Sequence, residues 1–369
     1  MTRKLTFLII TCILCAAFIF SLNGCGKEEE VTTTIPTTVT TTTTTTTEPT
    51  TEPPLPANFN NLTGLTNISN EAAGKRPIAV MINNIKSSLP QYGIYSADIM
   101  LETLVEGGIT RMMALYADYT KVPKICSVRS CRYYYPIFAH GFDAVYFCFG
   151  SNESLATPTL ERIGIDYFDG NKTYDSLVFG RDSNRLKSYS REHTAYVNGA
   201  NIPQMLKKYS VRDTYAEGKN VPVFNFRAEG DKQAAGDTIA DNVRLNFSNS
   251  YYSTFKYDTE SKVYYKTHCG NAHIDSANGK QLNYTNVFVL EAVINNYKSS
   301  SLQEIDWSGG TGYYISCGKA EPILWRKTSE SANIELYRGA DGSPLTVNAG
   351  NSYIGIIKTG CTKITANAQ

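Results

Sequence analysis

Short apolar runs separated by turn residues dominate the chain beyond residue 67, and their lengths predict buried strands rather than long helices. In the first half these runs cover residues 76–84, 97–105, 110–116 and 143–149. Gly150, Ser151 and Asn152 follow the last run and open a predicted helix that continues to Ile163. The pattern therefore predicts a mixed sheet with flanking helices in this half.

The second half is patterned mainly as short strands. From about Val221 the apolar runs shorten and turn residues recur; the runs cover residues 243–247, 253–257, 262–267, 286–294 and 312–317. We predict an α+β layered sandwich: an N-terminal part at residues 67–228 with a mixed sheet and helices, and a mainly β C-terminal part at 229–369.

The N-terminus has the pattern of a bacterial lipoprotein signal. Two basic residues precede an apolar run, which ends in Leu22-Asn23-Gly24-Cys25. We expect residues 1–24 to be removed and Cys25 to carry the lipid, which places the body on the extracytoplasmic face of the cell membrane. An uncleaved helical anchor is the alternative and gives the same topology. Either topology excludes enzymes that draw on cytosolic ATP or nicotinamide pools.

Residues 25–66 are predicted to form a disordered tether. They contain the unbroken threonine run 40–47 with scattered proline, and such a composition buries too little apolar area to fold. In an extended state, at roughly 3.1 Å per residue, the tether would span on the order of 100 Å. It is either an O-glycosylated stalk or a plain spacer.

Composition restricts the partners. Hydrophobic residues make up 42%, which suits a folded core, and the net charge of +1 gives no general basic field for nucleic acid. Six cysteines remain beyond Cys25, without a CxxC pair, and several lie inside apolar runs. We therefore expect mostly free, buried thiols.

The first candidate cluster surrounds a predicted hairpin. If Gly107–Gly108 form a two-residue loop, Leu104 faces Arg111 on the opposite strand. Glu102 and Glu106 would then lie diagonal to Arg111 on the same face. This arrangement is either a catalytic pair of acids or a structural ion pair, and we favour the ion pair.

A second cluster follows at residues 127–132. Arg129 and Arg132 are three positions apart, so a helical turn would place both on one side, and Ser130 adds a hydroxyl. Guanidinium groups with a hydroxyl can hold a phosphate or a carboxylate. Pro136 limits a regular helix here, so an irregular turn is also possible. Arginines that pair with Glu102, Glu106 or Asp143 are the structural alternative.

Other polar residues give weaker signals. Arg181, Asp182 and His193 form a secondary candidate cluster, although a lone histidine is usually structural. His268, Cys269, His273 and Asp275 are close in sequence but match no zinc spacing. The turn at residues 150–152 lacks the phosphate-loop lysine and the three-glycine dinucleotide motif. We expect neither a metal nor a cofactor.

Several segments together resemble a known family, the YerB-like lipoproteins of Gram-positive bacteria, described as domain of unknown function 3048 with N- and C-terminal parts. The similar segments are 76–84 (RPIAVMINN), 90–93 (PQYG), 97–99 (ADI), 105–111 (VEGGITR), 128–132 (VRSCR), 143–146 (DAVY), 273–275 (HID), 279–282 (GKQL) and 324–327 (LWRK). They cover essentially the whole body, and 105–111 is the most specific. Asn83 or Asn84 replaces an aspartate, and Ser127 and Tyr133 replace prolines of the family pattern. The resemblance implies a lipoprotein with a layered α+β fold and a link to cell-wall synthesis proteins, but no established reaction.

Three functions remain open. The first, which we favour, is a non-enzymatic adaptor that binds an envelope-assembly protein. The second is binding or turnover of an anionic envelope substrate, a lipid-linked phosphate or a glycan. Its candidate residues are Arg111, Arg129, Ser130, Arg132, Glu102, Glu106 and Asp98. The third, a solute-binding lipoprotein, is disfavoured because the body lacks two comparable α/β lobes.

Overall fold

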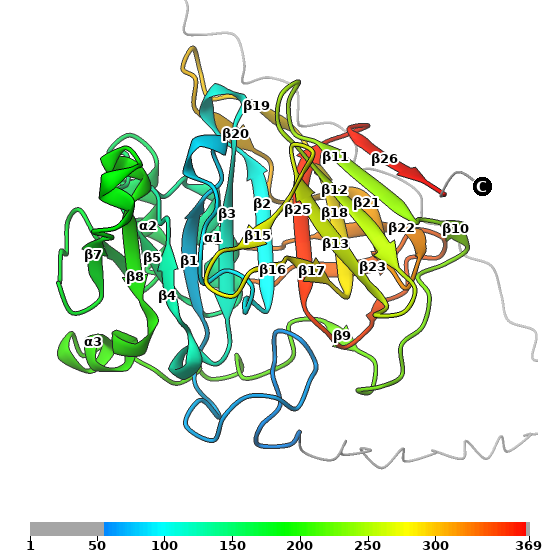
Figure 1. Cartoon of the computed structure of the whole chain (residues 1–369). Helices are drawn as coiled ribbons and strands as arrows, with labels where there is room; N and C mark the ends of the chain where they lie inside the picture. Colours follow the sequence, from blue (N-terminus) through cyan, green and yellow to red (C-terminus); the bar gives the residue numbers. More distant parts are fainter. Residues whose placement is uncertain (1–54, 367–369) are drawn as a thin grey trace, which may run out of the picture. The chain divides into compact units, whose positions relative to one another are not determined.

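The computed structural model describes residues 55–366 (Figure 1). Cys25, the signal segment and most of the predicted tether lie outside the described residues. Within residues 55–366, no helix has both the length and the hydrophobicity required to cross a bilayer.

The centre of the fold is one mixed sheet of eleven strands. Its strands are, in spatial order, β10 (Thr238–Ile239), β22 (Lys319–Arg326), β21 (Gly309–Ser316), β18 (Asn286–Ala292), β25 (Ser352–Lys358), β2 (Ile99–Leu104), β3 (Thr110–Tyr116), β1 (Ile78–Asn83), β5 (Val145–Cys148) and β6 (Tyr167–Asp169), with β23 (Glu335–Arg338) beside β22. β25 pairs in parallel with both β2 and β18, so the two predicted parts share this sheet.

A second, antiparallel sheet lies against one face of the large sheet. It contains β14 (Asn271–Ala272), β13 (Val263–His268), β12 (Tyr252–Asp258), β11 (Asn242–Asn246) and β26 (Thr362–Thr365), with β17 (Asn283–Tyr284) beside β13. Side chains from β12 and β13 contact Glu102 of β2, and a Cβ on Gly355 of β25 would come within 2.6 Å of Leu245. The two sheets therefore pack closely around Glu102.

The described α-helices are α1 (Tyr134–Gly141), α2 (Ala156–Ile163) and α3 (Ile202–Lys208), all in the first half. Tyr134 and Tyr135 of α1 donate hydrogen bonds to the carbonyl oxygens of Leu104 and Arg111 in the β2–β3 hairpin. Arg111 lies on the face of the sheet opposite Glu102, and Tyr134 and Tyr135 are close enough to Arg111 to influence its pKa, so α1 covers the face opposite the second sheet. The α+β class predicted from the sequence is confirmed, with helices in the first half and strands dominating the second.

Shorter elements complete the body. The small sheets are β4 (Lys124–Cys126) with β8 (Ala195–Asn198) and β7 (Phe179–Arg181), β9 (Asn225–Phe226) with β24 (Thr346–Val347), β15 (Ile274–Asp275) with β16 (Lys280–Gln281), and β19 (Ile294–Asn296) with β20 (Gln303–Ile305). The 3-10 turns are η1 (Lys86–Ser88), η2 (Glu106–Gly108), η3 (Tyr119–Lys121), η4 (Arg185–Lys187), η5 (Arg191–His193) and η6 (Gly199–Asn201).

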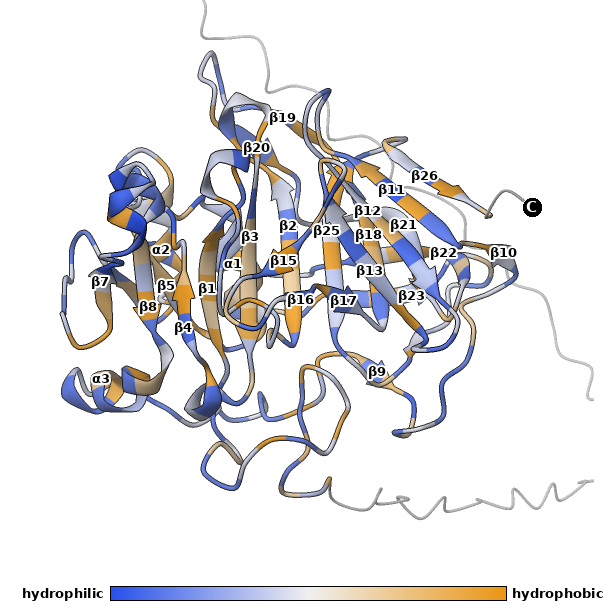
Figure 2. Cartoon of the chain, in the orientation of Figure 1, coloured by the Kyte–Doolittle hydropathy of each residue, from blue (hydrophilic) through white to orange (hydrophobic). Residues whose placement is uncertain are grey.

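Burial explains why these segments become strands. Every residue of β1, β2, β3 and β5 is buried, and Figure 2 shows largely apolar strands in the middle of the sheet with polar loops at their ends. The ordered body begins earlier than the predicted tether boundary. Leu62 is fully buried and the Gly64 N–H donates to the Asn60 carbonyl, so residues 60–64 pack on the body instead of extending from it.

Candidate functional site

The carboxyl ends of β1, β2, β5 and β6 meet at one edge of the large sheet, because these four strands run in the same direction. In Figure 1 the segment before β1 lies below the sheet, so this edge faces upward. The loops that follow the strands carry asparagine, lysine, serine and acidic side chains, and the segment after β4 brings Arg129 to the same edge, where its N–H donates to the Met81 carbonyl of β1. Such an edge is where open α/β sheets usually bind ligands, and we call it the carboxyl edge.

The β2–β3 hairpin has a different register from the predicted one. Leu104 pairs with Thr110, and Thr103 pairs with Arg111. The Val105 N–H donates to the Ile109 carbonyl, so the loop has three residues, Glu106–Gly108, instead of two. A shift of one residue moves a side chain to the other face of a sheet. The prediction that Glu102 and Arg111 share a face is therefore wrong.

Glu102 points toward the second sheet and is fully buried. Its Oε1 accepts hydrogen bonds from Asn84 and Thr110, and its Oε2 accepts hydrogen bonds from Ser253 and Tyr353. Lys266 Nζ lies 3.3 Å from Oε2. Burial alone would raise the pKa of Glu102, but Lys266, His268 and the hydroxyl donors hold it below its ordinary value. Glu102 is thus a buried carboxylate with a complete set of partners.

Two histidines extend this buried network. His273 lies 3.0 Å from Lys266 Nζ through Nδ1 and 3.0 Å from Gln91 Oε1 through Nε2. His268 Nδ1 lies 3.4 Å from Asn84 Nδ2, and burial followed by the charge of Lys266 lowers the pKa of His268 to about 4. Burial, followed by the charge of Lys266, also lowers the pKa of His273 well below its ordinary value, so both imidazoles are neutral near pH 7. We call Glu102, Lys266, His268 and His273 the buried network.

Glu106, in contrast, lies at the carboxyl edge between two arginines. Its Oε2 accepts a 2.6 Å hydrogen bond from Arg132 Nε, and its Oε1 lies 3.4 Å from an Arg111 guanidinium nitrogen. Arg111 also donates to the Ser130 carbonyl. These contacts match the structural ion pair that the sequence favoured, with Arg132 as a second partner.

Arg129 and Arg132 do not share a helical turn. Residues 129–132 form an irregular segment, and α1 begins only at Tyr134. Arg132 turns to Glu106, whereas Arg129 lies 3.2 Å from Glu192, whose side chain is 56% exposed. Arg129 Nε is buried without a hydrogen-bond partner among the described residues. Burial, followed by the charge of Arg111, lowers the pKa of Arg129.

The three residues of the secondary cluster, Asp182, His193 and Arg181, have different surroundings. Asp182 accepts hydrogen bonds from Lys124 and Tyr92; burial opposes its ionisation, but these donors keep its pKa well below the ordinary value. His193 is buried between Asn83 and Ser87. Arg181 stacks on Phe149 at 4.3 Å and has no carboxylate within ion-pair distance in the described part of the chain.

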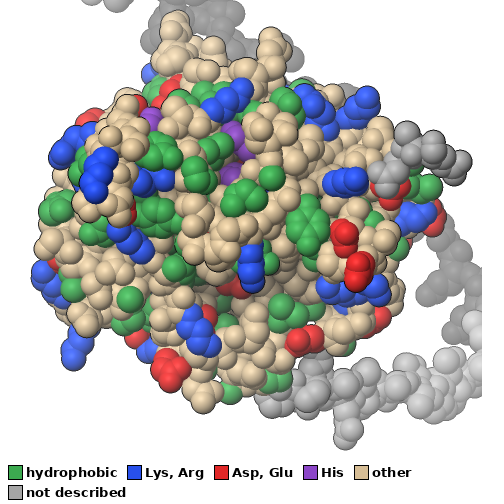
Figure 3. Space-filling model, in the orientation of Figure 1, with side chains coloured by type: hydrophobic (Ala, Val, Ile, Leu, Met, Phe, Trp, Pro, Cys, Tyr) green, Lys and Arg blue, Asp and Glu red, His purple; other side chains and the backbone are tan. Residues whose placement is uncertain are grey.

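Figure 3 shows lysine and arginine side chains on the left of the face, over the region of α2, β7 and β8, and others along its top and upper right. The pKa of Arg181 is lowered by burial first and then by Arg191 and Arg129. Arg129 is in turn influenced by Arg111. The guanidinium groups are therefore close enough to repel one another, and the exposed Glu192 offsets only part of their charge.

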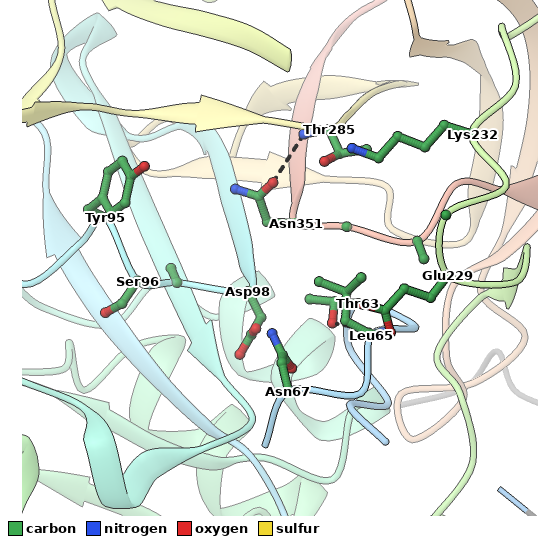
Figure 4. A pocket seen from close by; sticks show the side chains of 14 residues that line it. Thr63, Leu65, Asn67, Tyr95, Ser96, Asp98, Glu229, Lys232, Thr285 and Asn351 are labelled. Carbon is green, nitrogen blue, oxygen red and sulfur yellow. Dashed lines mark hydrogen bonds between the residues drawn. The ribbon is translucent and has the colours of Figure 1, made fainter. Parts of the chain in front are cut away.

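Asp98 lies away from the other candidates. It precedes β2, at the opposite edge of the sheet from Arg129, and its carboxylate accepts hydrogen bonds from Asn60 and the Ala117 N–H. Burial raises its pKa to about 6. Asp98 borders a polar hollow of about 480 Å³, shown in Figure 4, which is also lined by Thr63, Leu65, Asn67, Tyr95, Ser96, Ala97, Glu229, Gly230, Lys232, Thr285, Ala349, Gly350 and Asn351. The predicted grouping of Asp98 with Glu102 and the arginines is wrong.

The sulfur and histidine residues do not form a metal centre. Asp275 accepts hydrogen bonds from the Gly93, Ile94 and Tyr95 N–H groups, away from His268. Among the described residues no three histidine, cysteine, aspartate or glutamate side chains could hold a metal ion together. All six described cysteines are free, as expected, but only Cys126, Cys131 and Cys148 are buried.

Sequence reasoning missed two groups. Lys266, Ser253 and Tyr353 reach Glu102 from distant strands, and no local pattern indicates that contact. Glu192 was missed because its contact with Arg129 depends on the conformation of the segment between β7 and β8. An available signal was the density of charge in residues 181–193, which contain three arginines, one lysine, two acids and a histidine.

The fold defines an α+β protein with one large mixed sheet and a basic carboxyl edge. Comparison with protein families matches residues 62–212 to the N-terminal domain, and residues 243–354 to the C-terminal domain, of the family described as "Protein of unknown function (DUF3048)". The chain belongs to this family.

One relative and one solved structure are similar to the chain over most of its length. A Bacillus subtilis (strain 168) protein named "Putative lipoprotein YerB" is 27% identical over 301 residues, which cover 80% of this chain and 85% of the relative. The crystal structure of YerB protein from Bacillus subtilis covers 83% of this chain and 99% of its own, with a TM-score of 0.70 and 24% identity. The resemblance to YerB-like proteins is confirmed, and the structural match shows a shared fold.

Proposed function

We propose that the protein is a surface lipoprotein of a Gram-positive bacterium whose body acts as a non-enzymatic adaptor in cell-envelope assembly. The signal pattern before Cys25 and the lipoprotein name of the Bacillus subtilis relative support lipid anchoring. On this proposal, the chain between Cys25 and the packed segment at residues 60–64 forms the tether, and the body stands on the extracytoplasmic face. We also propose that the body is a layered sandwich whose N-terminal part ends at residue 228 and whose C-terminal part begins at residue 229.

The observation that carries the binding role is the basic carboxyl edge. Arg129 and Arg181 lie there with few acidic partners, and Arg129 Nε has no hydrogen-bond partner among residues 55–366. Arginines that are already partly desolvated and held in place can bind an acidic partner surface with less loss of side-chain entropy. An envelope-synthesis protein with carboxylates at its docking face would suit this edge.

The buried network supports a non-enzymatic role for Glu102. A catalytic acid must reach its substrate within hydrogen-bond distance. Glu102 is 0% exposed and already accepts four hydrogen bonds, so its interactions stabilise the packing of the two sheets.

In-cell crosslinking with co-purification tests the adaptor proposal. The full lipoprotein is compared with an Arg129→Ala/Arg181→Ala variant and with Arg162→Ala, which removes an exposed arginine of α2 that pairs with Glu330. We expect one envelope protein to be enriched with wild type and Arg162→Ala and lost in the double variant. Enrichment of no envelope protein over an unrelated lipoprotein would reject the adaptor role.

A second candidate is binding or turnover of an anionic envelope substrate, such as a lipid-linked phosphate or a glycan. The specific observation is that Arg181 has no carboxylate partner among the described residues and lies beside Phe149 and Gly150, at the end of β5. The same experiment tests this candidate. A lipid or glycan, instead of a protein, should then co-purify with wild type and be absent from the double variant.

A further inference from the structure

We propose that Arg129, Arg181 and Ser130 form a phosphate-binding site at the carboxyl edge, and that the side chain of Glu192 occupies part of this site until a phosphate displaces it. The inference rests on the proposed binding role of this edge and names the chemical group that is bound. The site excludes Arg111 and Arg132, because both already contact the carboxylate of Glu106.

The backbone of η5 places the two guanidinium groups side by side. Arg181 donates a 2.7 Å hydrogen bond to the Arg191 carbonyl, and Arg129 NH1 lies 3.5 Å from the carbonyl of Glu192. Carbonyl groups of consecutive residues in one helical turn are only a few ångströms apart. Both guanidinium groups are thus fixed on adjacent acceptors, and each retains further N–H donors.

Ser130 and Gly150 form the wall beside this pair. A Cβ on Gly150 would come within 3.0 Å of both Ser130 Oγ and Asn171 Nδ2, so the two polar groups converge on the glycine. Gly150 has a φ of +100°, which a residue with a side chain rarely adopts. Arg181 packs on the neighbouring Phe149. The Ser130 hydroxyl now donates to the Phe149 carbonyl and can rotate toward a ligand.

Nearby acids are committed elsewhere, except for Glu192. Asp169 accepts hydrogen bonds from the Gly150 N–H and Ser151, and Asp182 from Lys124 and Tyr92. Glu192 contacts Arg129 at 3.2 Å and lies 3.6 Å from His193 Nε2, but its side chain is 56% exposed, so water can replace its contact with Arg129 at low cost. It therefore acts as an internal competitor for the arginines.

The site favours phosphate over a carboxylate. A tetrahedral phosphate presents three or more oxygens and up to two negative charges, so it can bridge two guanidinium groups and a hydroxyl together. A carboxylate, like that of Glu192, has two oxygens in one plane and one charge. Free phosphate monoesters have all of these properties, whereas the phosphodiester of a lipid headgroup keeps the tetrahedral geometry but has two unesterified oxygens and one charge.

Isothermal titration of the full-length lipoprotein in detergent tests the site. The titrants are inorganic phosphate, glycerol 1-phosphate, short-chain phosphatidylglycerol and acetate. We expect one saturable site for at least one phosphate compound and weaker binding of acetate. Since each variant removes charge-assisted hydrogen bonds to the ligand, Arg129→Ala and Arg181→Ala should each weaken phosphate binding by about tenfold or more.

Glu192→Gln gives the decisive result, because a merely structural glutamate would not compete with ligand. This variant should bind phosphate several-fold more tightly, and Arg162→Ala should match wild type. If an alanine variant fails to unfold cooperatively, Arg129→Lys and Arg181→Lys replace it, since lysine keeps the charge but loses the fork of donors.

The preferred titrant separates the two sources of phosphate. Tighter binding of phosphatidylglycerol would assign a lipid headgroup, and tighter binding of glycerol 1-phosphate a soluble monoester. Phosphate binding that Arg129→Ala and Arg181→Ala leave unchanged, no binding, or weaker binding by Glu192→Gln would overturn the site. The adaptor proposal can hold even if this inference fails. That result would be a protein partner captured in cells by a body that binds no phosphate.

Discussion

Lys266 Nζ lies 3.3 Å from Glu102 Oε2, and both side chains are completely buried. The pair joins β13 of the smaller sheet to β2 in the middle of the large sheet. Four hydrogen bonds to the Glu102 oxygens complete the arrangement, so the charge on each partner is compensated inside the protein. A buried pair of this kind stabilises a specific packing as long as both partners are present.

Removing one partner should therefore be costly. Lys266→Met leaves Glu102 buried without its cation, and we expect a loss of about 3–5 kcal/mol in the free energy of unfolding. Urea denaturation at pH 7, followed by circular dichroism, measures this loss. The double variant Glu102→Gln/Lys266→Met should recover part of it, because no isolated charge remains.

The exposed pair Arg326–Glu335 provides the matched control for the buried pair. Its side chains are 58% and 38% exposed, so Arg326→Ala should change stability by no more than about 1 kcal/mol. A Lys266→Met protein as stable as the Arg326→Ala protein would show that Glu102 is not held as a carboxylate.

His268 should make the protein sensitive to mild acid. Burial and the neighbouring Lys266 lower its pKa from 6.5 to about 4, against the opposing charge of Glu102. The unfolded chain therefore binds the proton first, and stability falls as pH drops from about 6.5 to about 4. A depression of this size corresponds to a loss on the order of 3 kcal/mol.

Urea unfolding of wild type and His268→Gln at several pH values isolates this effect. The variant should lose less stability across the same pH range. Asp98 acts in the opposite direction, because its raised pKa of about 6 makes stability fall as pH rises toward 6, but it does so equally in both proteins. Parallel curves for the two proteins would exclude His268 as the group that titrates.

The sequence predicted the strands well because they are buried on both faces. β1 and β3 consist of residues with almost no exposed surface, and continuous apolar runs are the expected signature of such strands. The hairpin register was not predictable in the same way. Both Gly107 and Gly108 adopt positive φ, and either a two- or a three-residue loop could contain them.

The length of this loop determines which side chains lie together in the candidate site. With the observed loop, Glu102 turns to the second sheet and Arg111 turns to α1, so one predicted cluster becomes two. The pairing of Arg129 with Arg181 was equally hidden. It depends on the carbonyls of Arg191 and Glu192, which only the folded β7–β8 connection brings to both arginines.

Arg132 and Arg129 should respond differently to mutation, although they are three residues apart. Arg132→Ala removes a 2.6 Å charged hydrogen bond to Glu106, and we expect a loss of about 1–3 kcal/mol in stability. Its effect on phosphate affinity should be small. Arg129→Ala should do the reverse, since Glu192, its carboxylate partner among residues 55–366, is more than half exposed.

Urea unfolding and phosphate titration of both variants measure this contrast. The Glu106→Gln protein serves as the companion of Arg132→Ala, because it breaks the same contact from the other side. Equal losses of phosphate affinity in Arg129→Ala and Arg132→Ala would extend the site to the hairpin and would contradict the structural role of Glu106.

The six cysteines of the body should divide into two classes of reactivity. Burial raises the pKa of Cys126 to about 11 and that of Cys131 to about 12, and Cys148 is also fully buried. Cys269, Cys317 and Cys361 are partly exposed. Because the thiolate is the reactive form, iodoacetamide at pH 8 should modify only the exposed set in the native protein.

Peptide mass spectrometry after a short native reaction, and again after unfolding in urea, separates the two classes. The buried set should appear only in the unfolded sample. Rapid native modification of Cys131 would be the informative failure, since this thiol lies beside Arg129 and Arg132 in the chain. It would mean that the carboxyl edge opens to solvent, and the arginine contacts described there would then belong to only one of its states.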